Sequence, residues 1–318
     1  MESIGLLIEF KKGRVKAANL GMAAAAGRGA RQVVAFVIDA PIEAAKSDLA
    51  AHGISRIINI NTANPAWNPE VRAAAVVAAM DRFEISSLIG LTSPEGRELL
   101  PRIAARLDAP LVMDCIDIDL DNHRARTSQY SGKTIATIAL TGNHFIYGLR
   151  ANVIAPCQRP VDAEVVEFSY EREALPEYQV LDTRTNSSGT QYMAEADVII
   201  AGGRGMKSGE NFQLLFDCAR HINASVGASR VAVDNGWVPY AMQVGQTGMK
   251  VNPKVYLAVG ISGSVQHFAG MKTARMIIAV NTDENAAIMA NCDYFAVGDL
   301  FQILPELERG LAKAKTGQ

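Results

Sequence analysis

The sequence predicts two α/β domains, each a mostly parallel sheet flanked by helices, and three observations lead to this fold class. The chain has 318 residues, which suits two domains of ~100–200 residues each. Apolar residues make up 49% of it, enough for sheets that are buried on both faces. Short runs rich in valine and isoleucine alternate with alanine-rich stretches of helical periodicity, which is the pattern of βαβ units.

The first half alternates between strands and helices. Helices are expected over Glu70–Phe83 and Glu95–Leu107, because Pro69 and Pro94 stand where a first helical turn tolerates a missing N–H. The apolar runs between the helical stretches predict strands at Ile4–Ile8, Val33–Ile38, Arg56–Ile60, Ile85–Leu91 and Leu111–Met113.

The pattern changes after Lys133. Two strand-like runs, Lys133–Leu140 and His144–Gly148, flank the turn residues Thr141-Gly142-Asn143, which predicts a hairpin. Farther on, the small polar residues of Thr185–Thr190 show no periodicity and are typical of a linker. We therefore expect an N-terminal domain over residues 1–188 and a C-terminal domain over residues 189–318.

The second half predicts a doubly wound domain. Strands are expected at Asp197–Ala201, Ala224–Val226, Val255–Gly260, Met276–Asn281 and Tyr294–Gly298, and all gaps but the first leave room for a helix. Each strand runs into glycine, serine, asparagine or aspartate at its carboxyl end. Because ligands of open α/β sheets bind outside those ends, this half predicts a nucleotide-type site built from several loops.

Composition argues against several other classes of protein. A formal net charge of -2 gives no bulk attraction to nucleic acid. The four cysteines form no CxxC pair and the five histidines form no ligand-like pair, so no metal site is expected. The acidic alternation Asp117–Asp121 lacks the glycine and glutamate of an EF-hand, since Asn122 and Ser128 stand at those positions; a strand with acids facing solvent is the better interpretation.

Nothing in the sequence indicates targeting or membrane insertion. No apolar run approaches ~20 residues, and the start lacks the pattern of a signal or transit peptide. A cytoplasmic location is therefore the expectation.

Six segments of the second half carry residues suited to binding an anionic cofactor. Glycines let backbone N–H groups approach a phosphate, and arginine is its bidentate partner. Taken singly, the segments have ordinary structural explanations: a tight turn for the first, a helix start for the second, a core or surface histidine for His267, and helix caps for the last strand ends. The segments are Gly202–Gly205 with Arg204, Val226–Arg230, Gln243–Gly248, Val259–His267, and the strand ends at Asn281 and Gly298-Asp299.

The order and spacing of these segments resemble the FAD domain of electron-transfer flavoprotein alpha subunits. The resemblance extends from about Asp197 to Leu307, and Val255–Met271 is similar to that family's signature segment. Arg126–Lys133 resembles the family's arginine–tyrosine–glycine strand entry more loosely. The chain is thus identified as a member of that family, whose members carry electrons on FAD and pair with a beta subunit.

The resemblance implies a role for each matching residue. Arg204, Ser229 and Ser262–Ser264 would hold the pyrophosphate and ribityl region, while Asn281 and Asp299, with Leu300, would hold the adenosine end. Gln246 and Thr247 would face the isoalloxazine ring, Arg230 would lie against it, and His267 would lie near its O2 edge. The full set of implied cofactor-binding residues is Arg204, Ser229, Arg230, Val244, Gly245, Gln246, Thr247, Ser262, Gly263, Ser264, Val265, Gln266, His267, Asn281, Asp299 and Leu300.

The same resemblance implies partners. Electrons would arrive from a dehydrogenase, an acyl-CoA dehydrogenase above all, and leave to a quinone oxidoreductase or another acceptor. A subunit of an electron-bifurcating flavoprotein is an open alternative. A non-redox adenine-nucleotide-binding module and an NAD-binding transferase fit less well, because Gln246-Thr247 and Ser264–His267 suit a flavin ring and no separate substrate machinery is visible.

Overall fold

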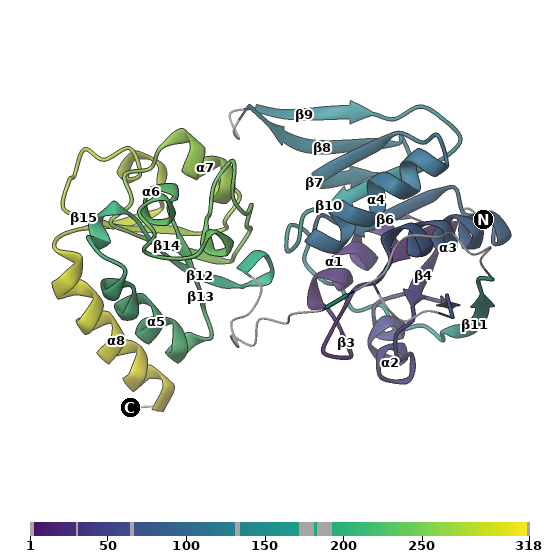
Figure 1. Ribbon diagram of the computed structural model, residues 1–318, viewed down its shortest axis with the longest axis horizontal. Helices are drawn as coiled ribbons and strands as arrows, with labels where there is room; N and C mark the ends of the chain where they lie inside the picture. Colours follow the sequence, from purple (N-terminus) through teal and green to yellow (C-terminus); the bar gives the residue numbers. More distant parts are fainter. Residues whose placement is uncertain are drawn as a thin grey trace. The chain divides into compact units, whose positions relative to one another are not determined.

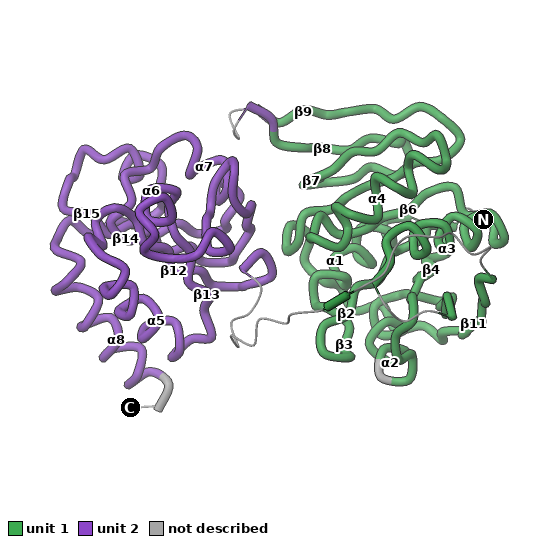
Figure 2. The backbone as a smooth tube through the Cα atoms, in the orientation of Figure 1, with its two compact units in different colours: residues 1–128, 135–186 green, residues 129–134, 187–318 purple. Residues whose placement is uncertain are grey.

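The computed structural model describes residues 3–29, 31–63, 67–130, 134–171, 181–182 and 193–316. The chain divides into two compact units (Figure 2), unit 1 with residues 1–128 and 135–186 and unit 2 with residues 129–134 and 187–318. The expected linker, Thr185–Thr190, and the expected boundary after residue 188 lie outside the described residues, so that boundary stays a prediction.

Unit 1 is built on a sheet with the strand order β11-β5-β4-β1-β6-β10-β7-β8-β9. The strands from β11 to β7 are parallel, and β8 runs antiparallel to β7. The strands are β1 (Ser3–Leu7), β4 (Gln32–Ile38), β5 (Arg56–Asn61), β6 (Ser87–Leu91), β7 (Leu111–Asp119), β8 (Arg124–Gln129), β9 (Thr134–Ala139), β10 (Phe145–Leu149) and β11 (Glu164–Ser169), with a small ribbon of β2 (Phe10–Lys11) and β3 (Arg14–Val15) beside them.

Helices cover both faces of this sheet (Figure 1), as βαβ units require. One core cluster joins α1 and α2 to the sheet, and a second cluster joins α3 and α4 to its other face. Asn68 and Ser93 accept backbone N–H bonds that cap α3 and α4, each followed by a proline as predicted. The helices are α1 (Ala17–Ala26), α2 (Glu43–Ala51), α3 (Pro69–Arg82) and α4 (Pro94–Arg106).

The predicted hairpin of unit 1 is wrong. β10 lies between β6 and β7 and is parallel to both, whereas β9 stands at the far edge beyond β8. Every residue of β10 is buried, while residues of β9 are exposed or half-buried. An entirely apolar strand gains most from the interior of the sheet, and this gain overrides the local turn signal at Thr141-Gly142-Asn143.

Unit 2 is a doubly wound domain with a parallel sheet of the order β13-β12-β14-β15-β16. Its strands are β12 (Val198–Gly202), β13 (Ser225–Ala228), β14 (Val255–Val259), β15 (Ile277–Asn281) and β16 (Tyr294–Val297), close to the predicted ranges. α7 packs in one core cluster, and α5, α6 and α8 pack in another. The helices are α5 (Gln213–Ile222), α6 (Arg230–Asp234), α7 (Val265–Met271) and α8 (Leu300–Thr316), with 3-10 turns η1 (Met193–Glu195), η2 (Arg204–Met206), η3 (Glu210–Phe212), η4 (Tyr240–Met242) and η5 (Met289–Asn291).

The expectation that the first gap of unit 2 lacks a helix is also wrong. α5 fills this gap, because Leu215, Cys218 and Ala219 form an apolar stripe that is buried against α8 and the sheet. At the opposite edge, every residue of β16 is exposed. In the part of the chain that the structure describes, no helix combines the length and hydropathy needed to cross a bilayer.

Candidate functional site

The winding of the unit 2 sheet changes direction between β12 and β14, and the loops that leave these two strands pack backbone against backbone. A Cβ on Gly203 would lie 2.3 Å from the Gly260 carbonyl oxygen. Gly260 itself has a φ of +60°, and a Cβ there would lie 2.8 Å from the Gly205 Cα. Only glycine allows this approach, so the glycines bring both loops to the switch point where α/β sheets bind ligands.

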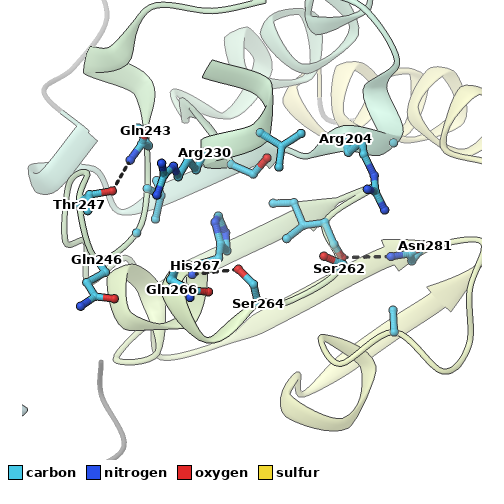
Figure 3. Close-up of a pocket in the computed structure, with 18 of the residues that line it drawn as sticks. Arg204, Arg230, Gln243, Gln246, Thr247, Ser262, Ser264, Gln266, His267 and Asn281 are labelled. Carbon is cyan, nitrogen blue, oxygen red and sulfur yellow. Dashed lines mark hydrogen bonds between the residues drawn. The ribbon is translucent and has the colours of Figure 1, made fainter. Parts of the chain in front are cut away.

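A cavity of about 500 Å³ opens at this switch point (Figure 3). Its wall comes from the carboxyl ends of several strands and from the loop between α6 and β14. The lining residues are Arg204, Gly205, Ser229, Arg230, Val231, Gln243, Val244, Gly245, Gln246, Thr247, Gly260, Ile261, Ser262, Ser264, Gln266, His267, Asn281, Asp283 and Ala286. A smaller cavity of about 190 Å³ shares Gly205, Gly260 and Asn281 with it and is also lined by Lys207, Thr282, Gly298, Asp299, Leu300 and Phe301.

Most of the residues expected from the sequence therefore come together in one place. Asp299 and Leu300 lie in the smaller, adjoining cavity. Gly263 and Val265 line neither cavity. Gly263 is buried, and a Cβ there would lie 2.5 Å from the Ile288 backbone nitrogen. Val265 is 47% exposed. Sequence reasoning missed Gln243, Asp283 and Lys207 as lining residues, although Gln243 begins the glycine- and amide-rich loop that it had singled out.

Hydrogen bonds fix the loop that carries Gln246 and Thr247. The buried Gln243 donates from Nε2 to the Thr247 Oγ1 at 3.0 Å, and the Tyr240 hydroxyl donates to the Thr247 carbonyl. The Gln246 N–H donates to the Gln266 carbonyl of α7 at 2.8 Å. Since the Thr247 hydroxyl accepts from an amide that cannot accept in return, its own proton remains available to a ligand.

The loop also touches α7 without any side chain between them. A Cβ on Gly270 would lie 2.3 Å from the Gly245 backbone nitrogen. The Val251 N–H donates to the Gly270 carbonyl at 2.7 Å. Two glycines thus let the loop from Gln243 to Gly248 lie directly on the helix that carries His267.

Ser229 and Ser264 each cap the start of a helix and keep a hydroxyl proton that can be donated to a ligand. The hydroxyls of Ser229 and Ser264 accept backbone N–H bonds, each at 3.4 Å, from Ala232 and His267. Each thereby begins a short helix. A hydroxyl that accepts such a bond still has its own O–H to donate, and both serines line the cavity.

The two arginines of the cavity are exposed and turned toward it (Figure 3). Arg204 forms no ion pair with any described residue. Arg230 pairs with Asp234 at 3.1 Å, but both side chains are more than half exposed. Because such exposed pairs contribute at most about 1 kcal/mol, either guanidinium can turn to an anionic ligand at little cost. In the smaller cavity, the Lys207 ammonium lies 4.9 Å from the Phe301 ring centroid.

His267 is the one buried ionisable side chain of the cavity wall among the described residues. Burial lowers the pKa of His267 to about 4, although the Val244 backbone acts in the opposite direction. Its Nε2 lies 2.9 Å from the Tyr256 hydroxyl, and its Nδ1 is buried without a hydrogen-bond partner among the described residues. The imidazole is therefore neutral near pH 7, which removes the imidazolium as a source of positive charge.

The residues present fit an anionic dinucleotide better than an uncharged ligand. The wall offers two guanidinium groups and hydroxyl groups on three loops. Asp283 and Asp299 add acceptors that suit ribose hydroxyls or adenine N–H groups.

Comparison with known proteins gives the same result for both halves of the chain. Residues 4–172 match the electron transfer flavoprotein domain, and residues 192–272 match the electron transfer flavoprotein FAD-binding domain. Electron transfer flavoprotein subunit alpha of Syntrophomonas wolfei is 30% identical over 98% of this chain and 100% of its own length. The protein of the same name from Pseudomonas aeruginosa is 33% identical over 97% of this chain and 100% of its own length. The one from Megasphaera elsdenii is 35% identical over 89% of this chain and 87% of its own length.

These matches cover nearly the whole chain, and the FAD-binding match contains the cavity residues from Arg204 to His267. Electron transfer flavoprotein alpha subunits pair with a beta subunit and take electrons from dehydrogenases. The chain belongs to the alpha subunits of the electron transfer flavoprotein family, FAD-based electron carriers.

Proposed function

We propose that this chain holds its FAD in the two adjoining cavities of unit 2 and passes electrons from an acyl-CoA dehydrogenase to a quinone oxidoreductase or a comparable acceptor. The observation that carries the proposal is the convergence of guanidinium, hydroxyl and amide donors from separate loops on one switch point. Bound FAD supplies the one-electron redox chemistry, and the chain needs no nucleophile or general base of its own.

Each part of the wall has a proposed task. Arg204, Ser229, Ser262 and Ser264 bind the pyrophosphate and ribityl region through charge-assisted hydrogen bonds. Asn281, Asp299 and Leu300 bind the adenosine end, in and beside the smaller cavity. These groups fix the cofactor and leave its ring against the loop from Gln243 to Met249.

The remaining residues tune the ring. Thr247 would donate a hydrogen bond from its hydroxyl to the flavin N5, and Gln246 would face the ring. Arg230 supplies a permanent positive charge, because a guanidinium stays protonated at any physiological pH. Fixed donors and a fixed cation favour the extra negative charge of a reduced ring.

The proposal includes a division of labour between the halves of the chain. Residues 1–188 dock on a beta subunit, and residues 189–318 bind FAD. A docking role suits unit 1, since it is a complete α/β unit with its own two core clusters but its sequence has no convincing ligand-binding loops.

The test begins with the alpha and beta subunits purified as a complex. The complex should be yellow, release FAD on denaturation, and lose its flavin absorbance when an acyl-CoA dehydrogenase and its substrate are added. Arg204→Met should weaken FAD binding about tenfold or more, and Arg220→Met, an exposed arginine on α5, should not. A complex that carries a bare adenine nucleotide and no flavin would favour the non-redox module instead.

A further inference from the structure

A tyrosine outside the cavity contacts the histidine in its wall. Tyr256 of β14 is 0% exposed, and its hydroxyl lies 2.9 Å from the Nε2 of His267 on α7. The two rings meet edge to face, with centroids 6.0 Å apart. Among the described residues this imidazole is the only hydrogen-bond partner of the phenol. The bond thus links the central part of the sheet to the helix behind the cavity.

The protonation states of both rings follow from burial. Burial raises the pKa of the Tyr256 phenol well above its usual value, so the hydroxyl keeps its proton. Burial lowers the pKa of His267, so the imidazole is neutral and has one N–H. A neutral imidazole exposes one donor nitrogen and one acceptor nitrogen, so the bond to Tyr256 has two possible directions.

Counting satisfied groups decides between the two directions. If Nε2 carried the hydrogen and donated to the phenol oxygen, the phenol O–H would have no acceptor among the described residues and Nδ1 would be an unused acceptor. If the phenol donates to Nε2, the contact satisfies the only proton of Tyr256, and the hydrogen of His267 sits on Nδ1. The second arrangement leaves fewer buried polar groups unsatisfied.

We propose that Tyr256 is a positioning residue. Its hydroxyl donates a hydrogen bond to His267 Nε2 and thereby holds the imidazole as the neutral Nδ1–H tautomer. His267 then carries its single ring N–H on Nδ1, so this nitrogen is a hydrogen-bond donor and the ring is not a cation. This inference rests on the proposed function, because His267 and Val244 line the cavity that is assigned to FAD. The tyrosine acts on the cofactor only through the histidine.

The direct experiment is nitrogen NMR on the complex of the full chain with its beta subunit, with ¹⁵N-labelled histidine in the alpha chain. The wild-type spectrum should show the His267 ring as a single Nδ1–H tautomer. Tyr256→Phe should convert it to a mixture or to the Nε2–H form. Tyr294→Phe makes the same chemical change at an exposed position of the same sheet and should leave the spectrum unchanged.

The second readout is the midpoint potential of FAD, measured where FAD is bound at full stoichiometry. Loss of a fixed donor should shift the equilibrium toward oxidised flavin about threefold to tenfold in Tyr256→Phe. The Asn side chain in His267→Asn can place an N–H near the Nδ1 position. The midpoint potential of FAD in this variant should therefore lie closer to the wild-type value than the potential in His267→Gln. This pair of variants carries the test if Tyr256→Phe does not fold.

Two results would overturn the proposal: an Nε2–H tautomer in the wild type, or an unchanged tautomer and potential in Tyr256→Phe. Equal potentials in His267→Asn and His267→Gln would count against it as well. Failure of the proposed function looks different. A complex without flavin would refute the FAD role, yet the tautomer of His267 would remain measurable in it.

Discussion

The two sheets of this protein have the same architecture, but they use their switch points differently. In unit 1 the winding changes direction between β1 and β6, and a carboxylate lies there: Glu9 is 1% exposed, pairs with Lys16 at 2.6 Å, and accepts from the Ser93 hydroxyl. In unit 2 the corresponding point is lined by glycines and opens into a cavity. The side chains that follow the strands, not the fold, decide which sheet receives a ligand.

The largest expected effect is on the side-chain network of unit 1. Glu9→Ala should lower the free energy of unfolding of unit 1 by about 3 kcal/mol, because it breaks a buried ion pair. Fluorine NMR of fluorotryptophan-labelled complex can follow each unit separately, with Trp67 reporting on unit 1 and Trp237 on unit 2. Glu9→Gln should have an intermediate effect, and FAD content should not change. Equal destabilisation of both tryptophan signals would contradict the comparison.

Adding a side chain at the open switch point should come next in size. Gly260→Ala places a Cβ 2.8 Å from the Gly205 Cα at a φ of +60°, which should cost about 2 kcal/mol of unit 2 stability and weaken FAD binding at least tenfold. Fluorescence titration with FAD measures the affinity. Gly310→Ala is the matched control: it meets no atom within 4 Å inside α8 and should stabilise slightly. Normal FAD affinity in Gly260→Ala would refute the role given to the close backbone contact.

A smaller effect concerns pH and is confined to unit 1. Burial, followed by the charge of Glu9, raises the pKa of Glu95 from 4.5 to about 7, despite an arginine 3.6 Å away. The folded unit therefore holds a proton that the unfolded chain releases near pH 4.5. The stability contributed by neutral Glu95 is full below pH 4.5 and is lost as pH rises through about 7.

Denaturation at a series of pH values tests this. Between pH 4.5 and 7 the wild type should lose about 2 kcal/mol more than Glu95→Gln, which stays neutral throughout. Glu98→Gln, on the same helix and more exposed, serves as the control and should follow the wild type. A pH profile of Glu95→Gln that matches the wild type would show that this carboxyl titrates normally.

The smallest expected effect is on the midpoint potential of FAD, when a positive charge is removed either from the cavity or from elsewhere on unit 2. Arg230→Met should lower the midpoint potential of FAD by tens of millivolts, since about 59 mV corresponds to about 1.4 kcal/mol for one electron. Lys254→Met removes the same charge from an exposed pair with Asp197 and should shift the potential much less. Equal shifts in both variants would mean that Arg230 acts only through net charge.

The sequence predicted what depends on local pattern. Runs of valine and isoleucine placed most strands of both sheets within one or two residues, and the prolines before Glu70 and Glu95 placed two helix starts. Three polar edge segments were not placed: β7 continues to Asp119, six residues past its predicted end, and β8 and β11 were not predicted as strands. The hairpin at Thr141-Gly142-Asn143 failed because a turn signal says nothing about which strand an apolar segment will join. α5 was not predicted because the glycine-containing segment before it, which forms two 3-10 turns, gives no recognisable helix start.

The candidate site shows the same limit. Strand ends and glycines indicated which loops would meet, so Arg204, Thr247 and Asn281 were found. The residues that orient them were not, because Gln243 and Tyr256 look like ordinary loop and core residues until folding brings their partners within reach. The sequence also did not indicate which side chains near a strand end would line the cavity. Val265, for example, is exposed and lines neither cavity.

The backbone contact between Gly245 and Gly270 bears on the speed of electron transfer. Any group that must move when a cofactor gains or loses charge adds to the reorganisation energy, which slows tunnelling. Here the loop and helix touch without intervening side chains. Gln243 and Tyr240 donate hydrogen bonds to Thr247, and Gln246 donates one to the Gln266 carbonyl, which fixes these two loop residues. Dipoles that are already fixed need not reorient as the charge changes. We therefore expect a small reorganisation energy at this wall, which suits an electron carrier.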